Sequence, residues 1–267
     1  MACLFAKADK NNVKNIEPLS DQTLSSASIT MGTRHLIIIY YNGKYVLAQY
    51  GQWDGYPEGQ GFKILKFLST PGETTNLKSN LHLLHAATPD EIKAIEEECS
   101  QADREEQQRK PGHFLSMDDM ALNIRYPSLS RDTGANILNL IADAKDDKPI
   151  IIHDVKESLQ FAMHPICEWI YDIDLDANKL KVYSGQVAAF DSDAAPSTLV
   201  LSLQPGDLSE WEMLKNPVPQ LLVEFDIEKL PGEEEFVGQI KKRLSELEGE
   251  ENDDEGEEDG EEEHVNA

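Results

Sequence analysis

Two runs dense in Ile, Tyr, Val and Leu lie close together at His35–Tyr41 and Lys44–Tyr50. They are separated by Asn42-Gly43, a pair favoured in type I′ turns because both central positions of such a turn require a positive φ. Strand-forming residues on both sides of this pair indicate a β-hairpin. The sequence therefore predicts an antiparallel pair of strands from His35 to Tyr50.

A second strand region begins at Cys167, where apolar and polar positions alternate as far as Leu175. Alternation with a period of two predicts a strand with one buried and one solvated face. Asp172 and Asp174 are expected on the solvated face. A turn at 176–178 predicts an antiparallel return strand, and further strands are expected at 198–203 and 220–226.

Between these two regions the apolar spacing changes to three and four residues, which is typical of amphipathic helices. The best-defined start is Thr88-Pro89-Asp90-Glu91, because threonine caps the first turn, proline takes the first helical position and the glutamate can bond back to the cap. Pro111-Gly112 is expected to end this helix. Helices are predicted at 62–68, 76–87, 89–110, 117–124, 133–145 and 233–247.

Hairpins at both ends of the core with helices between them predict an α+β fold, in which an antiparallel sheet built from hairpins carries a central block of helices on one side. The sequence contains neither a glycine-rich dinucleotide motif nor a P-loop motif. Residues 31–247 are predicted to form a single domain. Residues 1–30 are expected to be a flexible leader, and residues 248–267 a disordered acidic tail.

The chain of 267 residues has a formal net charge of −26. Thirteen acidic residues lie between Glu246 and Glu263 without a Lys or Arg, which leaves −13 for the rest of the chain. Binding to nucleic acid or to an anionic membrane surface requires clustered Lys and Arg, so neither is an expected partner. The acidic tail suits a basic protein partner, or serves solubility alone.

Three cysteines, Cys3, Cys99 and Cys167, are an odd number at wide spacing, so reduced thiols are expected. The chain has no basic region followed by an apolar run of signal-peptide length near residue 1, and its longest apolar runs are too short to span a bilayer. These features predict a cytoplasmic protein, and the acidic tail is also compatible with the nucleus.

The segment Gly51–Gly61 places four glycines and a proline around two aromatic and two acidic side chains. Glycine and proline direct the backbone through sharp turns, so the other side chains are presented to solvent. Such aromatic rings can stack on a ligand, and the carboxylates can accept hydrogen bonds. The alternative is that the aromatic rings fold back onto the hairpin. We predict a ligand-binding or protein-binding module that uses Arg34, Gln52, Trp53, Asp54, Tyr56 and Glu58.

The same region resembles a known family. Met31-Gly32-Thr33-Arg34-His35-Leu36-Ile37, followed by Tyr45–Tyr50 and by Gly51-Gln52-Trp53-Asp54-Gly55-Tyr56-Pro57, is similar to the opening of a family of uncharacterised proteins from fungi and from bacteria and their phages. The resemblance covers most of residues 31–230 and is sharpest at the two predicted hairpins. It implies that the family pattern starts at Met31. It implies no activity, cofactor or catalytic residue.

An alternative enzymatic hypothesis concerns Thr33. Gly32-Thr33 before a hairpin is similar to the point where N-terminal-nucleophile hydrolases cut themselves, exposing a threonine whose hydroxyl attacks and whose amine serves as base. Asp54 or Lys44 would assist if the fold brought either of them near Thr33. Threonine is also common before strands because of its β-propensity.

Metal and cofactor sites have weaker support. His82 and His85 share a face if they lie on a helix, and His164 is close in sequence to Cys167, but these spacings are permissive only. A calcium loop beginning at Asp172 fails because its sixth position is not glycine and its twelfth is not glutamate. No metal and no cofactor is predicted.

Overall fold

The computed structural model describes residues 32–110, 112, 114–145, 148–164, 166–185, 199 and 219–253, with side chains as far as residue 247. The chain divides into two compact units, Met1–Met31 and Gly32–Ala267, and every described residue belongs to the second. The predicted leader at 1–30, residues 254–267 of the predicted tail, and the predicted strand at 198–203 apart from Leu199 lie outside the described residues.

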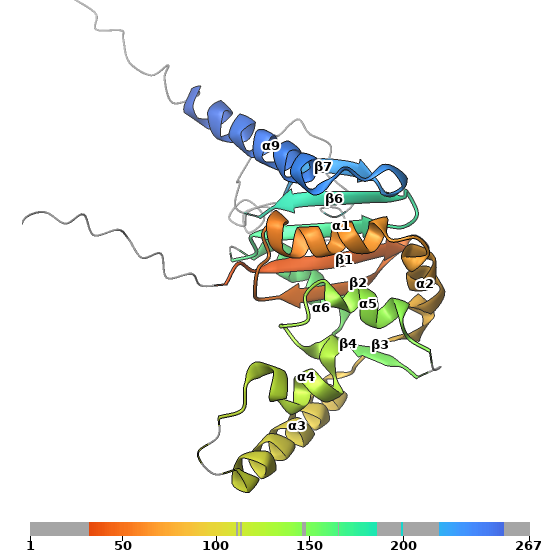
Figure 1. The fold of residues 1–267 in the computed structure, drawn as a ribbon, viewed down its shortest axis with the longest axis vertical. Coiled ribbons are helices and arrows are strands. Elements are labelled where there is room, and N and C mark those ends of the chain that lie inside the picture. Colours follow the sequence, from red (N-terminus) through yellow and green to blue (C-terminus); the bar gives the residue numbers. More distant parts are fainter. Residues whose placement is uncertain are drawn as a thin grey trace, which may run out of the picture. The chain divides into compact units, whose positions relative to one another are not determined.

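A five-stranded sheet with the spatial order β2-β1-β5-β6-β7 forms the centre of this unit (Figure 1). β1 and β5 are parallel, and the other three neighbouring pairs are antiparallel. The α+β class and the mainly antiparallel sheet are therefore confirmed. The strands are β1 His35–Tyr41, β2 Lys44–Gly51, β5 Trp169–Asp174, β6 Lys179–Ser184 and β7 Gln220–Asp226.

The first hairpin has the predicted turn. Asn42 has φ 53° and Gly43 has φ 75°, so both central residues occupy the left-handed region that a type I′ turn requires. His35 pairs with Gly51 at the other end of the hairpin. The loop after β2 therefore starts beside the first residue of β1.

The parallel pairing of β1 with β5 brings the two predicted hairpins side by side. Ile38 of β1 is the register partner of Asp172 of β5. This pairing joins segments that are far apart in the chain. Local sequence patterns do not predict it, since hairpin signals act only between neighbouring strands.

Helices pack on one face of the sheet, where α1 runs in nearly the same direction as the strands (Figure 1). Apolar side chains from β1, β5 and β6 meet Ile64, Ile137 and Phe236 there in one large core. The helices are α1 Phe62–Ser69, α2 Glu73–Asn80, α3 Pro89–Arg109, α4 Ala121–Arg125, α5 Asn136–Ala142, α6 Val155–Leu159 and α9 Glu233–Asp253. Short helical turns are η1 Pro57–Gly61, η2 Leu81–Leu83, η3 Met117–Asp119, η4 Pro127–Leu129, η5 Gln160–Met163 and η6 Ile227–Lys229.

The opposite face of the sheet is buried as well. Ile38 and Ile170 pack there against Leu159 of α6 and Ala162 of η5. The expectation that β5 has a solvated face is therefore wrong, because its alternate residues point into this second core. Asp172 and Asp174 are both buried.

A small second sheet pairs β3 Leu84–Ala86 in parallel with β4 Ile150–Ile152. The predicted helix at 76–87 consequently ends early, at Asn80. Pairing with a distant strand outweighs the local helical spacing here, as tertiary context commonly does.

The capped helix is α3, and its capping box is confirmed. Thr88 Oγ1 accepts a hydrogen bond from the Glu91 N–H at 3.3 Å, and the Thr88 N–H donates to Glu91 Oε2 at 2.8 Å. The final helix, α9, continues past its predicted end at residue 247 to Asp253. Within the described residues, no helix combines the length and apolar character needed to cross a membrane.

Candidate functional site

The Gly51–Gly61 loop is held against the sheet by two backbone contacts at Gly55. Its N–H donates to the Thr33 carbonyl at 3.0 Å, and its carbonyl accepts a hydrogen bond from the buried Tyr171 hydroxyl at 2.7 Å. The loop then enters the π-helical turn η1, which leads directly into α1. The segment is therefore fixed at its centre and at its end.

Two of the loop's glycines make room for His35. A Cβ atom on Gly51 would lie 2.1 Å from His35 Cε1, and one on Gly55 would lie 2.8 Å from His35 Cβ. Such distances leave no space for a side chain at either position. Glycine is therefore required at these two positions because the His35 side chain packs directly against their backbone.

The His35 imidazole is 1% exposed, and neither ring nitrogen has a hydrogen-bond partner among the described residues. Burial lowers the pKa of His35 to about 4, and the backbone of Thr33 opposes this shift only in part. The ring is therefore neutral at physiological pH. Sequence reasoning missed this residue, whose only signal was its position at the start of an apolar strand.

Gln60 ties the loop to α5. Its Oε1 accepts a hydrogen bond from the Ala135 N–H at 2.8 Å, and its Nε2 donates to the Trp53 carbonyl at 3.2 Å. Its own N–H donates to the Asp54 carbonyl at 2.8 Å. Gln60 is buried, so its amide holds the loop's shape and is not available to a ligand.

Trp53 is held in place yet remains open to solvent. Its Nε1–H donates to Asp132 Oδ1 at 2.7 Å, and its ring lies against the backbone of Gly32, where an added Cβ would be 2.1 Å from Trp53 Cε3. The side chain is nevertheless 42% exposed, and that of Tyr56 is 40% exposed. Of the alternative that both rings fold back onto the hairpin, the structure shows only the contact of Trp53 with Gly32, and both rings keep a large exposed area.

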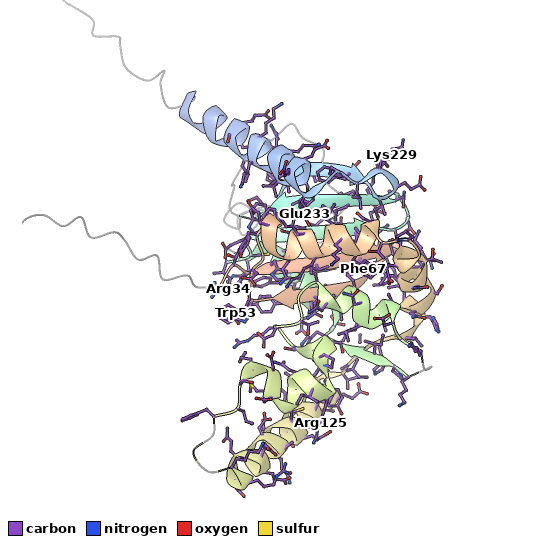
Figure 2. The ribbon with its side chains drawn as sticks, in the orientation of Figure 1. Arg34, Trp53, Phe67, Arg125, Lys229 and Glu233 are labelled. Atoms are coloured by element: carbon purple, nitrogen blue, oxygen red, sulfur yellow. The ribbon has the colours of Figure 1, made fainter. Side chains whose placement is uncertain are left out.

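Arg34 contributes its backbone to the sheet, since its N–H donates to Glu168 Oε1 at 3.1 Å and its carbonyl accepts from the Glu168 N–H at 3.1 Å. Its guanidinium forms no hydrogen bond or ion pair within the described residues. Figure 2 shows Arg34 and Trp53 at the same end of the sheet. The Arg34 side chain is consequently free to meet a partner near the tryptophan.

The two loop carboxylates are used differently. Glu58 forms an ion pair with Lys241 of α9 at 2.7 Å, and this contact lowers the pKa of Glu58 below its usual range. Asp54 is exposed and has φ 54°, and its backbone is where Gly59 approaches closely. Gln52 is half-buried and bonds through its N–H to the Arg131 carbonyl at 3.1 Å.

Thr33 is half-buried at the entrance to β1, beside the loop. Lys44 lies at the far end of the same hairpin, opposite Tyr41. A strand of this length separates its ends by roughly 20 Å. Lys44 therefore cannot assist Thr33. Asp54 lies closer, because it directly precedes Gly55, whose N–H donates to the Thr33 carbonyl.

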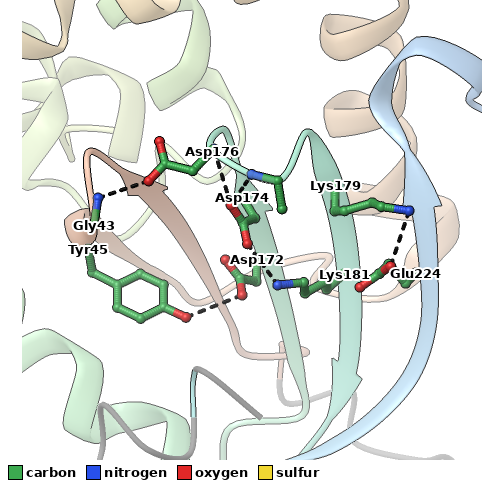
Figure 3. Close-up of polar contacts among 9 residues, drawn as sticks. Gly43, Tyr45, Asp172, Asp174, Asp176, Lys179, Lys181 and Glu224 are labelled. Atoms are coloured by element: carbon green, nitrogen blue, oxygen red, sulfur yellow. Dashed lines mark hydrogen bonds and ion pairs between the residues drawn. The ribbon is translucent and has the colours of Figure 1, made fainter.

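A second polar group, which sequence reasoning assigned to a solvated strand face, lies on β5 (Figure 3). Tyr45 reaches across β1, and its hydroxyl donates to Asp172 Oδ2 at 3.3 Å. Lys181 of β6 donates to Asp174 Oδ2 at 2.9 Å. Asp174 Oδ1 accepts from the Ala177 N–H at 2.8 Å, which shapes the turn between β5 and β6.

The pKa values of the two aspartates are shifted in opposite directions. Burial raises the pKa of Asp172 to about 7, with Lys181 opposing the shift and Asp174 adding to it. Burial alone would raise the pKa of Asp174, but hydrogen bonds from Ala177 and Lys181 hold it below its usual range. Asp172 Oδ1 has no hydrogen-bond partner in the part of the chain that the structure describes. Asp172 is therefore a carboxyl group that changes charge near neutral pH.

The residues considered for metal binding do not converge. His82 lies in η2, where Nδ1 is 2.7 Å from the Ser79 carbonyl oxygen, whereas His85 lies in β3 and contacts Glu91. Cys167 is buried, and burial raises the pKa of its thiol to about 12. No three His, Cys, Asp or Glu side chains in the described ranges are grouped to hold a metal ion.

Comparisons of the chain with protein-family models, curated proteins and solved structures found no match. The resemblance at Met31–Pro57 thus stays a prediction.

Proposed function

We propose that this chain is a protein-binding module. Its binding surface is formed by Arg34, Gln52, Trp53, Asp54, Tyr56 and Glu58, here called the aromatic loop surface. The observation that carries the proposal is Trp53, which is fixed by Asp132 and by Gly32 while 42% of it stays exposed. An immobilised but exposed tryptophan presents apolar area to a partner.

The energetics favour such a surface. Binding costs free energy for every side chain that must be ordered, and a ring that is already held in place avoids part of that cost. Trp, Tyr and Arg are also the residues that most often dominate the binding free energy of protein interfaces. Trp53, Tyr56 and Arg34 supply one of each at this end of the sheet.

A protein partner is favoured over a small molecule because the aromatic rings are presented outward. Three pockets of the described residues are lined by other residues, at the hairpin tip, beside α3 and α4, and at the start of α3. A ligand of drug size generally needs a concave site that covers most of its surface. A partner surface can instead cover Trp53 and Tyr56 from outside.

The net charge of −26 indicates the sign of the charge that a partner is expected to carry. A strongly acidic chain attracts basic proteins over distances of about a Debye length, roughly 8 Å at physiological salt. Asp54 and Asp132 are acidic groups close to Trp53, whereas Glu58 is already paired with Lys241. We therefore expect a basic partner whose association slows as salt is raised.

The test is a quantitative capture experiment with the full chain as bait. Trp53→Ala combined with Tyr56→Ala should reduce recovery of specific partners by at least about tenfold, which corresponds to 1.4 kcal/mol. The matched control combines Ile166→Ala with Leu221→Ala, since these apolar side chains are exposed to a similar degree, 42% and 36%. Equal recovery with both double variants would refute the proposal.

The Thr33 hypothesis is tested separately. If the chain is a self-processed hydrolase, intact-mass measurement of the freshly purified protein will show a chain beginning at Thr33. A chain that retains residues 1–32 and still binds its partner would exclude that hypothesis and leave the binding module standing.

A further inference from the structure

A pocket of about 440 Å³ lies at the tip of the first hairpin, at the opposite end of β1 from the aromatic loop surface. Its walls come from the hairpin, from α2 and η2, and from the small second sheet. We call it the hairpin-tip pocket. Its lining residues are Tyr41, Asn42, Lys44, Tyr45, Val46, Lys78, Ser79, Leu81, His82, Leu84, Ala86, Ile152 and Val155.

The charged side chains that line this pocket have one sign. Lys44 and Lys78 are its ionised groups, His82 is its one imidazole, and among the described residues no Asp or Glu lines it. This is unusual for a chain with 50 acidic and 24 basic residues. Neither lysine forms an ion pair within the described residues, whereas Lys179 is paired with Glu224 and Asp226.

The carboxylate of Asp176 lies at the same turn, but it already accepts hydrogen bonds from the backbone. Asp176 accepts a hydrogen bond from the Asn42 N–H at 3.0 Å through Oδ1 and from the Gly43 N–H at 2.8 Å through Oδ2. Both of its oxygens therefore bond to backbone donors, as Figure 3 shows for Gly43. Asp176 does not neutralise Lys44 by an ion pair.

The remainder of the pocket wall is largely apolar. Val46, Leu84 and Ile152 are half-buried or buried. A volume of this size falls within the range of roughly 300–1,000 Å³ that is typical of small-molecule sites. The pocket thus combines an apolar wall with unpaired positive charge.

We propose that the hairpin-tip pocket binds a small organic anion, namely a carboxylate, sulfonate or phosphate group carried on an apolar body. Lys44 and Lys78 would contact the anionic group, while the apolar wall covers the remainder of the ligand. This site is separate from the aromatic loop surface. The two can therefore be tested independently.

The test compares two probes that share one ring system. 8-Anilinonaphthalene-1-sulfonate is anionic, N-phenyl-1-naphthylamine is neutral, and both fluoresce more strongly in apolar surroundings. Lys44→Glu combined with Lys78→Glu should weaken binding of the sulfonate by at least about tenfold. Binding of the neutral probe should change by less than about twofold, because the apolar wall is unaltered.

The matched control combines Lys66→Glu with Lys229→Glu, two exposed lysines outside the pocket, and produces the same change in net charge. A second variant, Ser79→Trp, places a large side chain in the pocket from an exposed position and should weaken the binding of both probes. The proposal is overturned if the sulfonate does not bind, if the control double variant weakens it equally, or if Ser79→Trp leaves its binding unchanged.

Discussion

The Tyr45 hydroxyl donates a hydrogen bond to Asp172 Oδ2 at 3.3 Å, across the intervening strand β1. Tyr45 is also one of the residues that line the hairpin-tip pocket. Asp172 is 1% exposed, and no described residue forms a hydrogen bond with its other oxygen. A buried acid in this position makes the stability of the fold depend on pH.

The first prediction concerns that dependence. The pKa of Asp172 is about 7 in the folded chain and about 4 when unfolded, so the folded state holds the proton more tightly. The contribution of Asp172 to stability is therefore fully present below about pH 4 and is lost as pH rises to about 7. Above pH 7 the ionised, buried carboxylate costs stability.

The variant Asp172→Asn keeps the side-chain shape and removes this titration. Relative to the wild type, its free energy of unfolding should rise as pH increases from 4 to 8, by an amount on the order of a few kcal/mol. Urea denaturation at a series of pH values measures this difference. Asp118→Asn, at an exposed position in η3, is the control and should show no such trend. A constant difference for Asp172→Asn would contradict the raised pKa.

The second prediction concerns the contact between Gly51 and His35. Gly51→Ala places a methyl group within 2.1 Å of the imidazole and should destabilise the fold by about 1–3 kcal/mol, as overpacking of a core does. Gly238→Ala is the control, because no atom lies near its added methyl group and alanine favours the helix by about 1 kcal/mol.

Thermal unfolding of the double variant His35→Ala with Gly51→Ala completes the test. Removing the ring should cancel the clash, so the glycine substitution should cost much less in that background. Additive effects of the two substitutions would show that the close approach does not occur.

The third prediction concerns Gln60, which links the loop to α5. Gln60→Ala removes the acceptor of the Ala135 N–H and the donor to the Trp53 carbonyl, so we expect a loss of about 2 kcal/mol. Hydrogen exchange of the Ala135 amide should accelerate accordingly. Gln52→Ala is the control, since the Gln52 side chain forms no hydrogen bond within the described residues, and its effect should stay below about 0.5 kcal/mol. Equal losses for both variants would contradict the role of Gln60.

Elements that depend on neighbours in the chain were predictable from the sequence. The Asn42-Gly43 turn and the Thr88 cap are determined within a few residues, and both appear as expected. The pairing of β1 with β5 joins residues more than a hundred positions apart, and no local pattern encodes it. This pairing and the second core bury Asp172, which is why the alternating pattern was misleading.

In the candidate site, too, features set by neighbouring residues were predictable and features set by distant residues were not. The exposure of Trp53 and Tyr56 was predicted from the glycines and proline around them. The partners of Trp53 and Glu58 were not predictable, because Asp132 and Lys241 come from distant parts of the chain.

The fourth prediction concerns the central claim, that the aromatic loop surface is where a protein partner binds. A photo-crosslinking phenylalanine analogue is placed at Tyr56 in one preparation and at Ile166 in another, since both sites are similarly exposed. Irradiation in the presence of cell extract is followed by mass spectrometry of the adducts. Because Tyr56 belongs to the proposed surface, we expect a discrete adduct with a basic protein at position 56 and none at position 166. The same adducts at both positions, or none at position 56, would contradict the account.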